Sequence, residues 1–245
     1  MKKFFKTLMM CLVIIPCVFV LAACGGDPNQ VKVNTSGNYK ESSMQAFNET
    51  IVAAEDAEQL EFNAYRLSMK TAVKEGGETI DMVMHATIML GEGDDILMYA
   101  SISGNGEKLE YYVGEEYVYM NMDTEDAKMN CKMPKTGDFE SDLGAAQMAL
   151  EMGSVQSLLD NIAGVSGDVT VKSAVKGTTT KYQVSFEEEG AEVTIWFVFE
   201  NGTLTGIKSV QDAGDQGEAE LQMERFTGTT IAMPKWTEKS VLMEI

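Results

Sequence analysis

The chain has 245 residues and a net charge of −19 at neutral pH, from 38 acidic and 19 basic side chains. A nucleic-acid partner requires a basic surface, so this composition argues against that class of partner. The chain is long enough for one domain to stabilise itself through its own core.

The N-terminal segment has the pattern of a secretory signal peptide. Three lysines precede an apolar run of 16 residues from Leu8 to Ala23, which is shorter than the about 20 residues that a membrane-spanning helix needs. The run ends in Leu21-Ala22-Ala23-Cys24, which resembles the bacterial lipobox. This resemblance implies cleavage before Cys24 and a thioether-linked diacylglycerol on its sulfur. The alternative is an ordinary signal peptide that is cleaved after Ala23.

Loss of the signal peptide changes the composition of what remains. It removes three lysines and no acidic residue, and leaves 222 residues with 16 basic and 38 acidic side chains, a net charge of −22. Two cysteines leave with it, so Cys131 is the only cysteine besides the lipid site and no intramolecular disulfide can form. Anionic headgroups would repel so acidic a domain, so the lipid must provide the attachment. We expect an exported protein that is anchored to the outer face of the cell membrane.

The mature chain begins with a polar segment and continues as one domain. Residues 25–41 consist mainly of Gly, Asp, Asn, Thr and Ser, which is typical of a flexible tether. No linker divides the sequence after it. We therefore predict a lipoprotein signal peptide over 1–23, a lipidated tether over 24–41 and a single domain over 42–245.

Two regions of the domain have helical spacing. The first extends from Ser42 to Leu60, where Ser42 and Gln45 fit a capping box and an apolar stripe follows at Met44, Phe47, Ile51 and Ala54. The second follows Pro134 in two parts, with apolar stripes at Phe139, Leu143, Ala146 and Leu150, and then at Val155, Leu158, Leu159 and Ile162.

The rest of the domain alternates between apolar and polar residues, as half-buried antiparallel strands do. Asn105-Gly106 and Asn201-Gly202 are strong hairpin signals. The alternation predicts roughly eleven strands, at residues 65–73, 79–88, 96–103, 109–113, 117–122, 127–133, 169–175, 181–187, 192–200, 204–210 and 219–226.

This order of elements resembles the half-barrel fold of bacterial lipoprotein carriers, which include the LolA-like lipoprotein chaperones and the LprG-like glycolipid carriers. The resemblance covers residues 42–236 and rests on element order rather than on a motif. It implies an α+β fold in which a curved antiparallel sheet is covered on one face by helices, with a cavity for acyl chains between them. A fold resemblance by itself does not establish a function.

Methionines supply an argument from the residues themselves. The mature chain has 15 of them, many at the apolar positions of predicted strands, and methionine suits surfaces that accommodate variable apolar ligands. Filling of an ordinary core is the alternative. The candidate residues for a ligand cavity are Leu67, Met69, Met82, Met84, Met98, Met120, Met129, Phe197 and Leu221.

A sulfur cluster is possible near Cys131. A turn at 123–126 would place Met122 opposite Ala127, Met120 opposite Met129 and Val118 opposite Cys131. Met120, Met122, Met129 and Cys131 would then cluster, and soft sulfur ligands select Cu(I). The alternative is a buried free cysteine among core methionines. No cofactor is expected.

The sequence offers no catalytic constellation. The one histidine, His85, falls on the polar side of its strand, and no Gly-x-Ser-x-Gly motif is present. We expect a protein that is not an enzyme, and three hypotheses remain. The chain could carry a lipid or another hydrophobic ligand, it could bind another protein of the cell envelope as a structural or interaction lipoprotein, or it could handle Cu(I).

The lipid site can be tested with Cys24→Ser. We expect this variant to lose the mass of the diacylglycerol and to leave the membrane fraction, because the sulfur that carries the lipid is gone. Mass spectrometry of the mature N-terminus and fractionation of the expressing bacterium measure both effects. Equal membrane retention of wild type and variant would rule out anchoring through Cys24.

Overall fold

The computed structural model describes residues 31–60, 62–75, 78–90, 96–125, 127–135, 155–165, 167–188, 190–214, 217–226, 228 and 230–242. The expected signal peptide at 1–23, the expected lipid site Cys24 and the expected helix around Phe139 to Leu150 lie outside these residues.

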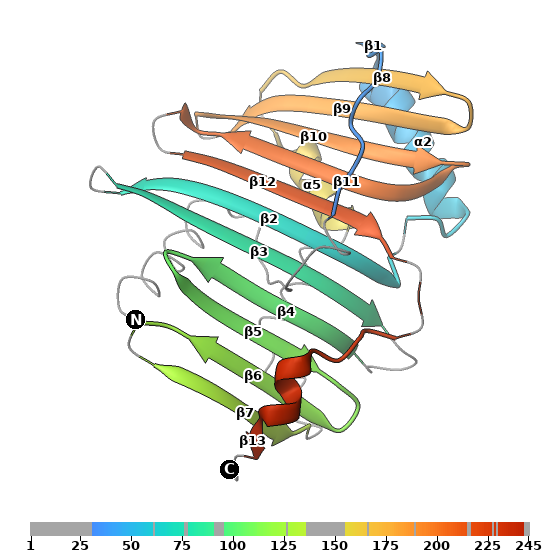
Figure 1. Cartoon of the computed structure of the whole chain (residues 1–245). Helices are drawn as coiled ribbons and strands as arrows, with labels where there is room; N and C mark the ends of the chain where they lie inside the picture. Colours follow the sequence, from blue (N-terminus) through green and yellow to red (C-terminus); the bar gives the residue numbers. More distant parts are fainter. Residues whose placement is uncertain are drawn as a thin grey trace.

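The described strands form one open sheet, which Figure 1 shows as a twisted surface. The strand order is β1-β8-β9-β10-β11-β12-β2-β3-β4-β5-β6-β7-β13, and every pair is antiparallel except β7 and β13. The strands are β1 (Lys40–Glu41), β2 (Ala64–Glu75), β3 (Glu78–Leu90), β4 (Ile96–Gly104), β5 (Glu107–Val113), β6 (Tyr117–Asp123), β7 (Lys128–Pro134), β8 (Thr170–Lys176), β9 (Thr179–Glu188), β10 (Ala191–Glu200), β11 (Thr203–Asp212), β12 (Gly217–Arg225) and β13 (Val241–Leu242).

The expected count of roughly eleven strands is too low. Each predicted segment overlaps one strand from β2 to β12, and the sheet has two further strands, β1 and β13, at its edges. Each of these has only two residues, which is too short for an alternation of apolar and polar residues to be recognised. Each edge strand pairs with only two residues of its neighbour, β8 or β7.

The two Asn-Gly pairs form hairpin turns, as the sequence predicts. Asn105 and Gly106 have φ angles of 51° and 81°, and Asn201 and Gly202 have φ angles of 53° and 81°. Two successive positive φ angles are characteristic of a type I′ turn, whose twist matches that of the strands it joins.

Two α-helices are described, α2 (Met44–Asp56) and α5 (Val155–Gly164). The cap of α2 is one residue later than predicted, because the Oγ of Ser43, rather than that of Ser42, accepts a hydrogen bond from the backbone N–H of Ala46. Both helices lie on the same side of the sheet (Figure 1). We call this side the inner face, and the two helices pack against part of it through one shared apolar core.

The core of the inner face is densest beneath α2. Phe47 is 1% exposed and its ring lies 5.3 Å from that of Tyr182 on β9 and 5.0 Å from that of Phe197 on β10. Ile51 and Ala54 follow on the same side of the helix and are also buried. The stripe predicted from the sequence is therefore the surface with which α2 meets the sheet.

The segment before β1 packs on the opposite, outer face of the sheet, where Figure 1 shows it crossing the strands. Val31 and Val33 are buried against Val198, and a Cβ on Gly206 would come within 3.2 Å of Val33. The Lys181 ammonium donates to the carbonyl oxygens of Asn34 and Ser36 at 2.6 and 2.8 Å.

This packing changes the expected boundary between tether and domain. Residues 31–41 were expected to be part of a flexible tether over 24–41, but they are docked on the sheet and end in β1. The described residues from Val31 to Glu41 therefore pack with the domain, and the predicted start at residue 42 is too late.

We expect Phe47→Ala to lower the free energy of unfolding by about 3–5 kcal/mol, because it leaves a cavity between two aromatic rings. Val52→Ala on the same helix is the control, since Val52 is 53% exposed and such surface changes stay within about 0.5 kcal/mol. Urea unfolding of both variants measures the difference. Similar losses in the two variants would show that α2 does not pack as described.

Candidate ligand surface

The inner face carries a regular array of side chains across β2 to β7. Residues that pair across the antiparallel strands point to the same side of the sheet and form rows. Three rows cross the six strands: Tyr65, Ile88, Met98, Val113, Val118 and Met133; Leu67, Ala86, Ala100, Tyr111, Met120 and Cys131; and Met69, Met84, Ile102, Leu109, Met122 and Met129.

In the second of these rows, from Leu67 to Cys131, the smallest side chains stand on β3 and β4. Ala86 and Ala100 sit side by side on β3 and β4 and are 2% and 0% exposed. They stand between the larger Leu67 and Tyr111, and each alanine extends only one methyl group from the sheet. In the other two rows, the neighbouring positions on β3 and β4 hold two methionines and two isoleucines: Met84, Met98, Ile88 and Ile102. This is the part of the inner face with the smallest side chains and the most adaptable neighbours.

Most of the predicted cavity residues belong to one core. Seven of them are buried in the same apolar cluster: Leu67, Met69, Met82, Met84, Met98, Phe197 and Leu221. The other two, Met120 and Met129, lie on β6 and β7, where they are half-buried and outside that cluster. The structure therefore brings together the residues of β2, β3, β4, β10 and β12.

The register around Cys131 differs from the prediction by two residues. Met120 pairs with Cys131 and Met122 pairs with Met129, rather than Met120 with Met129 and Met122 with Ala127. A shift of two residues keeps every side chain on its face, so the sulfur atoms of these four residues still share the inner face.

The shift results from the position of the hairpin turn. The turn comprises residues 124–127 instead of 123–126, because Asp123 pairs with Lys128 and forms an ion pair with it at 2.8 Å. The hydroxyl of Thr124 donates to the Ala127 carbonyl and accepts from the Ala127 N–H, both at 3.1 Å. These contacts are specific to the folded hairpin and cannot be recognised from turn composition.

Cys131 is a buried thiol. It is 2% exposed, and burial raises its pKa, so the sulfur stays protonated at neutral pH. Within the described part of the chain, no group of three or more His, Cys, Asp or Glu side chains is placed to hold a metal ion. Any soft metal would therefore have to be held chiefly by the methionine thioethers.

His85 lies on the outer face, as its position in the alternation predicts. It is half-buried, and both burial and the nearby charge of Lys70 lower its pKa. The side chain is therefore neutral at physiological pH.

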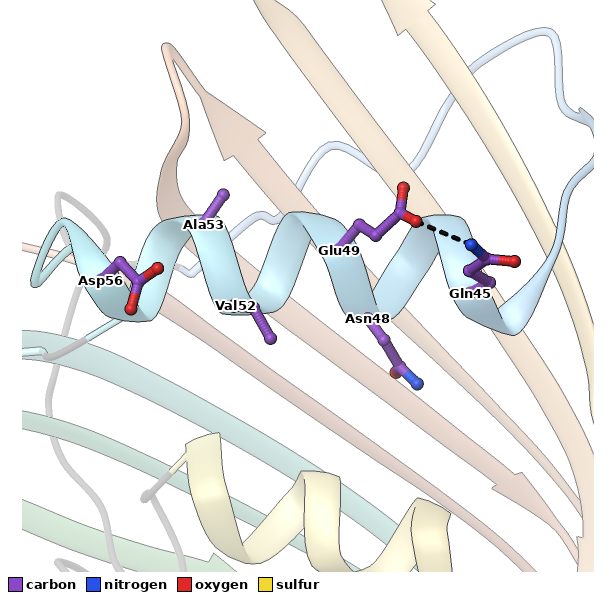
Figure 2. A pocket seen from close by; sticks show the side chains of 6 residues that line it. All are labelled: Gln45, Asn48, Glu49, Val52, Ala53 and Asp56. Carbon is purple, nitrogen blue, oxygen red and sulfur yellow. Dashed lines mark hydrogen bonds between the residues drawn. The ribbon is translucent and has the colours of Figure 1, made fainter.

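Two surface hollows lie away from the inner face. One follows the solvent side of α2, where exposed side chains of a single helix line it and Gln45 donates to Glu49 at 2.9 Å (Figure 2). The other lies at the ends of β9 to β11 and includes the acidic residues Glu187, Glu192 and Asp212. The Asp212 carboxylate accepts the Gly214 N–H and so closes a turn. Neither hollow contains a catalytic arrangement.

Sequence reasoning did not identify two buried hydroxyl groups on the inner face. Tyr65 and Thr71 on β2 are 3% and 5% exposed, and neither side-chain oxygen has a hydrogen-bond partner among the residues that the structure describes. Burial raises the pKa of Tyr65 to about 12. No pattern in the sequence distinguishes these hydroxyls from satisfied ones, because the distinction depends on what surrounds them.

The outer face holds a buried carboxylate, Glu110, which is 4% exposed. It accepts hydrogen bonds from the Tyr99 hydroxyl and the Asn121 amide at 2.8 Å and forms an ion pair with Lys108 at 2.8 Å. Burial acts to raise the pKa of Glu110, but the hydrogen bonds from Lys108, Asn121 and Tyr99 outweigh it, so the pKa is lowered. The network joins β4, β5 and β6.

None of the helices in the described ranges is both long enough and apolar enough to cross a membrane.

Glu110→Gln should lower the free energy of unfolding at pH 7 by about 1–3 kcal/mol, because it removes the charge that faces Lys108 and replaces one acceptor oxygen with an NH2 group that cannot accept a hydrogen bond. The pKa of Glu110 is lower in the folded protein than in the unfolded chain, where a glutamate has a pKa of about 4.3. Its carboxylate therefore stabilises the fold at pH values above about 4.3, and this stabilisation is lost as the pH falls through the folded pKa. Urea unfolding from pH 7 to pH 3 should therefore show the two proteins converging in acid. The exposed Glu192→Gln is the control, and a constant difference at every pH would contradict the role of the Glu110 charge.

Comparison with known proteins identifies no family. No protein-family model matches the chain, and no curated protein matches it. A solved structure described as the ywiB protein from Bacillus subtilis is similar over 70% of this chain and 99% of its own, with 11% sequence identity and a TM-score of 0.18. A likeness at this level carries no argument, so the function has to be inferred from the residues themselves.

Proposed function

We propose that the protein is a lipid-anchored lipoprotein outside the cytoplasm whose domain binds a lipid or another hydrophobic ligand between the inner face of the sheet and its helices, in the manner of a half-barrel. The observation that carries this proposal is the three-row array of the inner face. It extends over six strands, contains methionines in every row and has its smallest side chains at Ala86 and Ala100.

Methionine is poorly suited to a core whose only requirement is a single rigid packing. Its three rotatable bonds lose more rotamer freedom on burial than leucine or isoleucine do, and it specifies a single packing poorly. The same flexibility lets a surface repack around acyl chains of different length. Met84 and Met98 lie next to the two alanines, and Met69 is paired with Met84. This arrangement is better suited to accommodating a ligand than to fixing one packing.

The charge of the domain fits this role. With a net charge of −22 after cleavage, the domain would be repelled by anionic headgroups, and lipid on Cys24 would keep it near the membrane. Binding and release of an apolar ligand need no proton transfer or nucleophile, so the proposed activity is not enzymatic and requires no cofactor.

One observation favours a second function, the handling of Cu(I). The register pairs Met120 with Cys131 and Met122 with Met129 on one face, and paired residues have Cβ atoms about 5 Å apart. Thioethers bind Cu(I) without losing a proton, so the raised pKa of Cys131 does not prevent binding.

The test uses the mature chain with Cys24→Ser, expressed in a bacterial host and purified without detergent. Native mass spectrometry followed by organic extraction should show a stoichiometric lipid. Ala86→Leu should reduce its occupancy severalfold, because a large side chain replaces one of the smallest in the array. His85→Leu is the matched control, since His85 is the neighbour on β3 that points to the outer face, and it should retain the lipid.

The other outcomes separate the hypotheses. A clean apo mass that is unchanged after incubation with bacterial lipid extract would exclude the carrier and leave an envelope protein as the partner. A mass gain of one copper on addition of Cu(I), lost in Met120→Leu, would instead establish the metal function.

A further inference from the structure

The proposed ligand site has unexplained polar groups on β2. Tyr65 and Thr71 lie on the inner-face side of this strand, with Leu67 and Met69 between them. Both hydroxyls are buried without a partner, and an unsatisfied buried polar group costs about 1–3 kcal/mol. Such a group in a folded protein calls for a missing partner, such as a ligand.

Of the two hydroxyls, that of Tyr65 is the stronger evidence for a missing partner. A threonine hydroxyl rotates close to its own backbone, whereas the Tyr65 oxygen stands at the far end of a rigid ring and cannot reach its own strand. Its pKa of about 12 means that the phenol is protonated at every physiological pH. The hydroxyl is therefore available as a hydrogen-bond donor, and an oxygen acceptor would satisfy it.

A positively charged residue pairs with Tyr65 on the neighbouring strand. Arg225 on β12 pairs directly with Tyr65, and its guanidinium lies 5.0 Å from the ring centre of Phe62. It donates to the carbonyl oxygens of Gln59 and Leu204. No acidic side chain in the described part of the chain forms an ion pair with it, and two of its five N–H donors point to neutral acceptors. The Arg225 guanidinium is therefore a cation on the strand next to Tyr65 that has no ion pair with an acidic side chain among the described residues.

We propose that Tyr65 is the polar anchor of the ligand: its hydroxyl donates a hydrogen bond to a carbonyl or carboxylate oxygen at the head of an acyl chain, Arg225 supplies the positive charge, and the chain extends over Leu67 and Met69 toward Ala86. This inference rests on the proposed function and specifies its substrate class, an acyl amphiphile with an oxygen acceptor at its head. Fatty acids and acyl esters share that chemistry.

The test compares Tyr65→Phe with Tyr99→Phe in the mature Cys24→Ser chain, with lipid removed and palmitic acid titrated by calorimetry. We expect Tyr65→Phe to bind palmitic acid with a roughly tenfold higher Kd, because it loses the one hydrogen bond to the ligand. Its apo melting temperature should be equal to or above that of the wild type, because an unsatisfied hydroxyl is removed. Tyr99→Phe loses the bond to Glu110 on the outer face, so its melting temperature should fall while its Kd is unchanged.

Titration with methyl palmitate identifies the head group. Binding of palmitic acid at least tenfold tighter than the ester would assign a carboxylate to Tyr65 and Arg225, and equal affinities would assign a carbonyl oxygen. Equal Kd values for wild type and Tyr65→Phe would overturn the role of Tyr65 as anchor. The same conclusion would follow if the wild-type protein carries lipid on extraction but binds neither palmitic acid nor methyl palmitate. A wild-type protein that carries no lipid and binds none from bacterial extract would overturn the proposed function itself.

Discussion

The structure depends on keeping one face of a wide open sheet away from water. Antiparallel strands that alternate apolar and polar residues give the sheet one apolar face, and pairing across neighbouring strands makes that face continuous from β8 to β7. Burial of apolar surface is the dominant stabilising contribution. The helices α2 and α5 bury part of this face, with Phe47 inserted between Tyr182 and Phe197. The function proposed for the chain uses the same face.

The outer face is stabilised in a different way. The segment from Val31 to Tyr39 and the segment that contains the 3₁₀-helix η2 (Lys235–Lys239) cross it, and each adds a two-residue strand to one edge of the sheet. Between them, the buried carboxylate of Glu110 pairs with residues of three strands. This face is therefore held by hydrogen bonds and by the chain ends, which leaves the inner face as the surface that can adapt to a ligand.

The contrast between Glu110 and Tyr65 is informative about function. Both are buried polar side chains, but Glu110 has three partners whereas the Tyr65 hydroxyl has none. The unpaired hydroxyl in a methionine-rich apolar array therefore supports a bound molecule that has both an apolar and a polar part.

The sequence by itself determined the local structure: the eleven longer strands, the two Asn-Gly hairpins and the apolar stripes of α2 and α5 all follow from periodicity and turn chemistry, which act over a few residues. Periodicity also placed Met120, Met122, Met129 and Cys131 on one face, since a register error of two residues keeps that face. Only the tertiary structure decided the exact pairing near Cys131, the two edge strands, the docking of Val31 and Val33, and the isolation of the Tyr65 hydroxyl. Each of these depends on contacts between residues far apart in the chain, or on the position of one turn residue, Thr124, and such contacts leave no periodic pattern in the sequence.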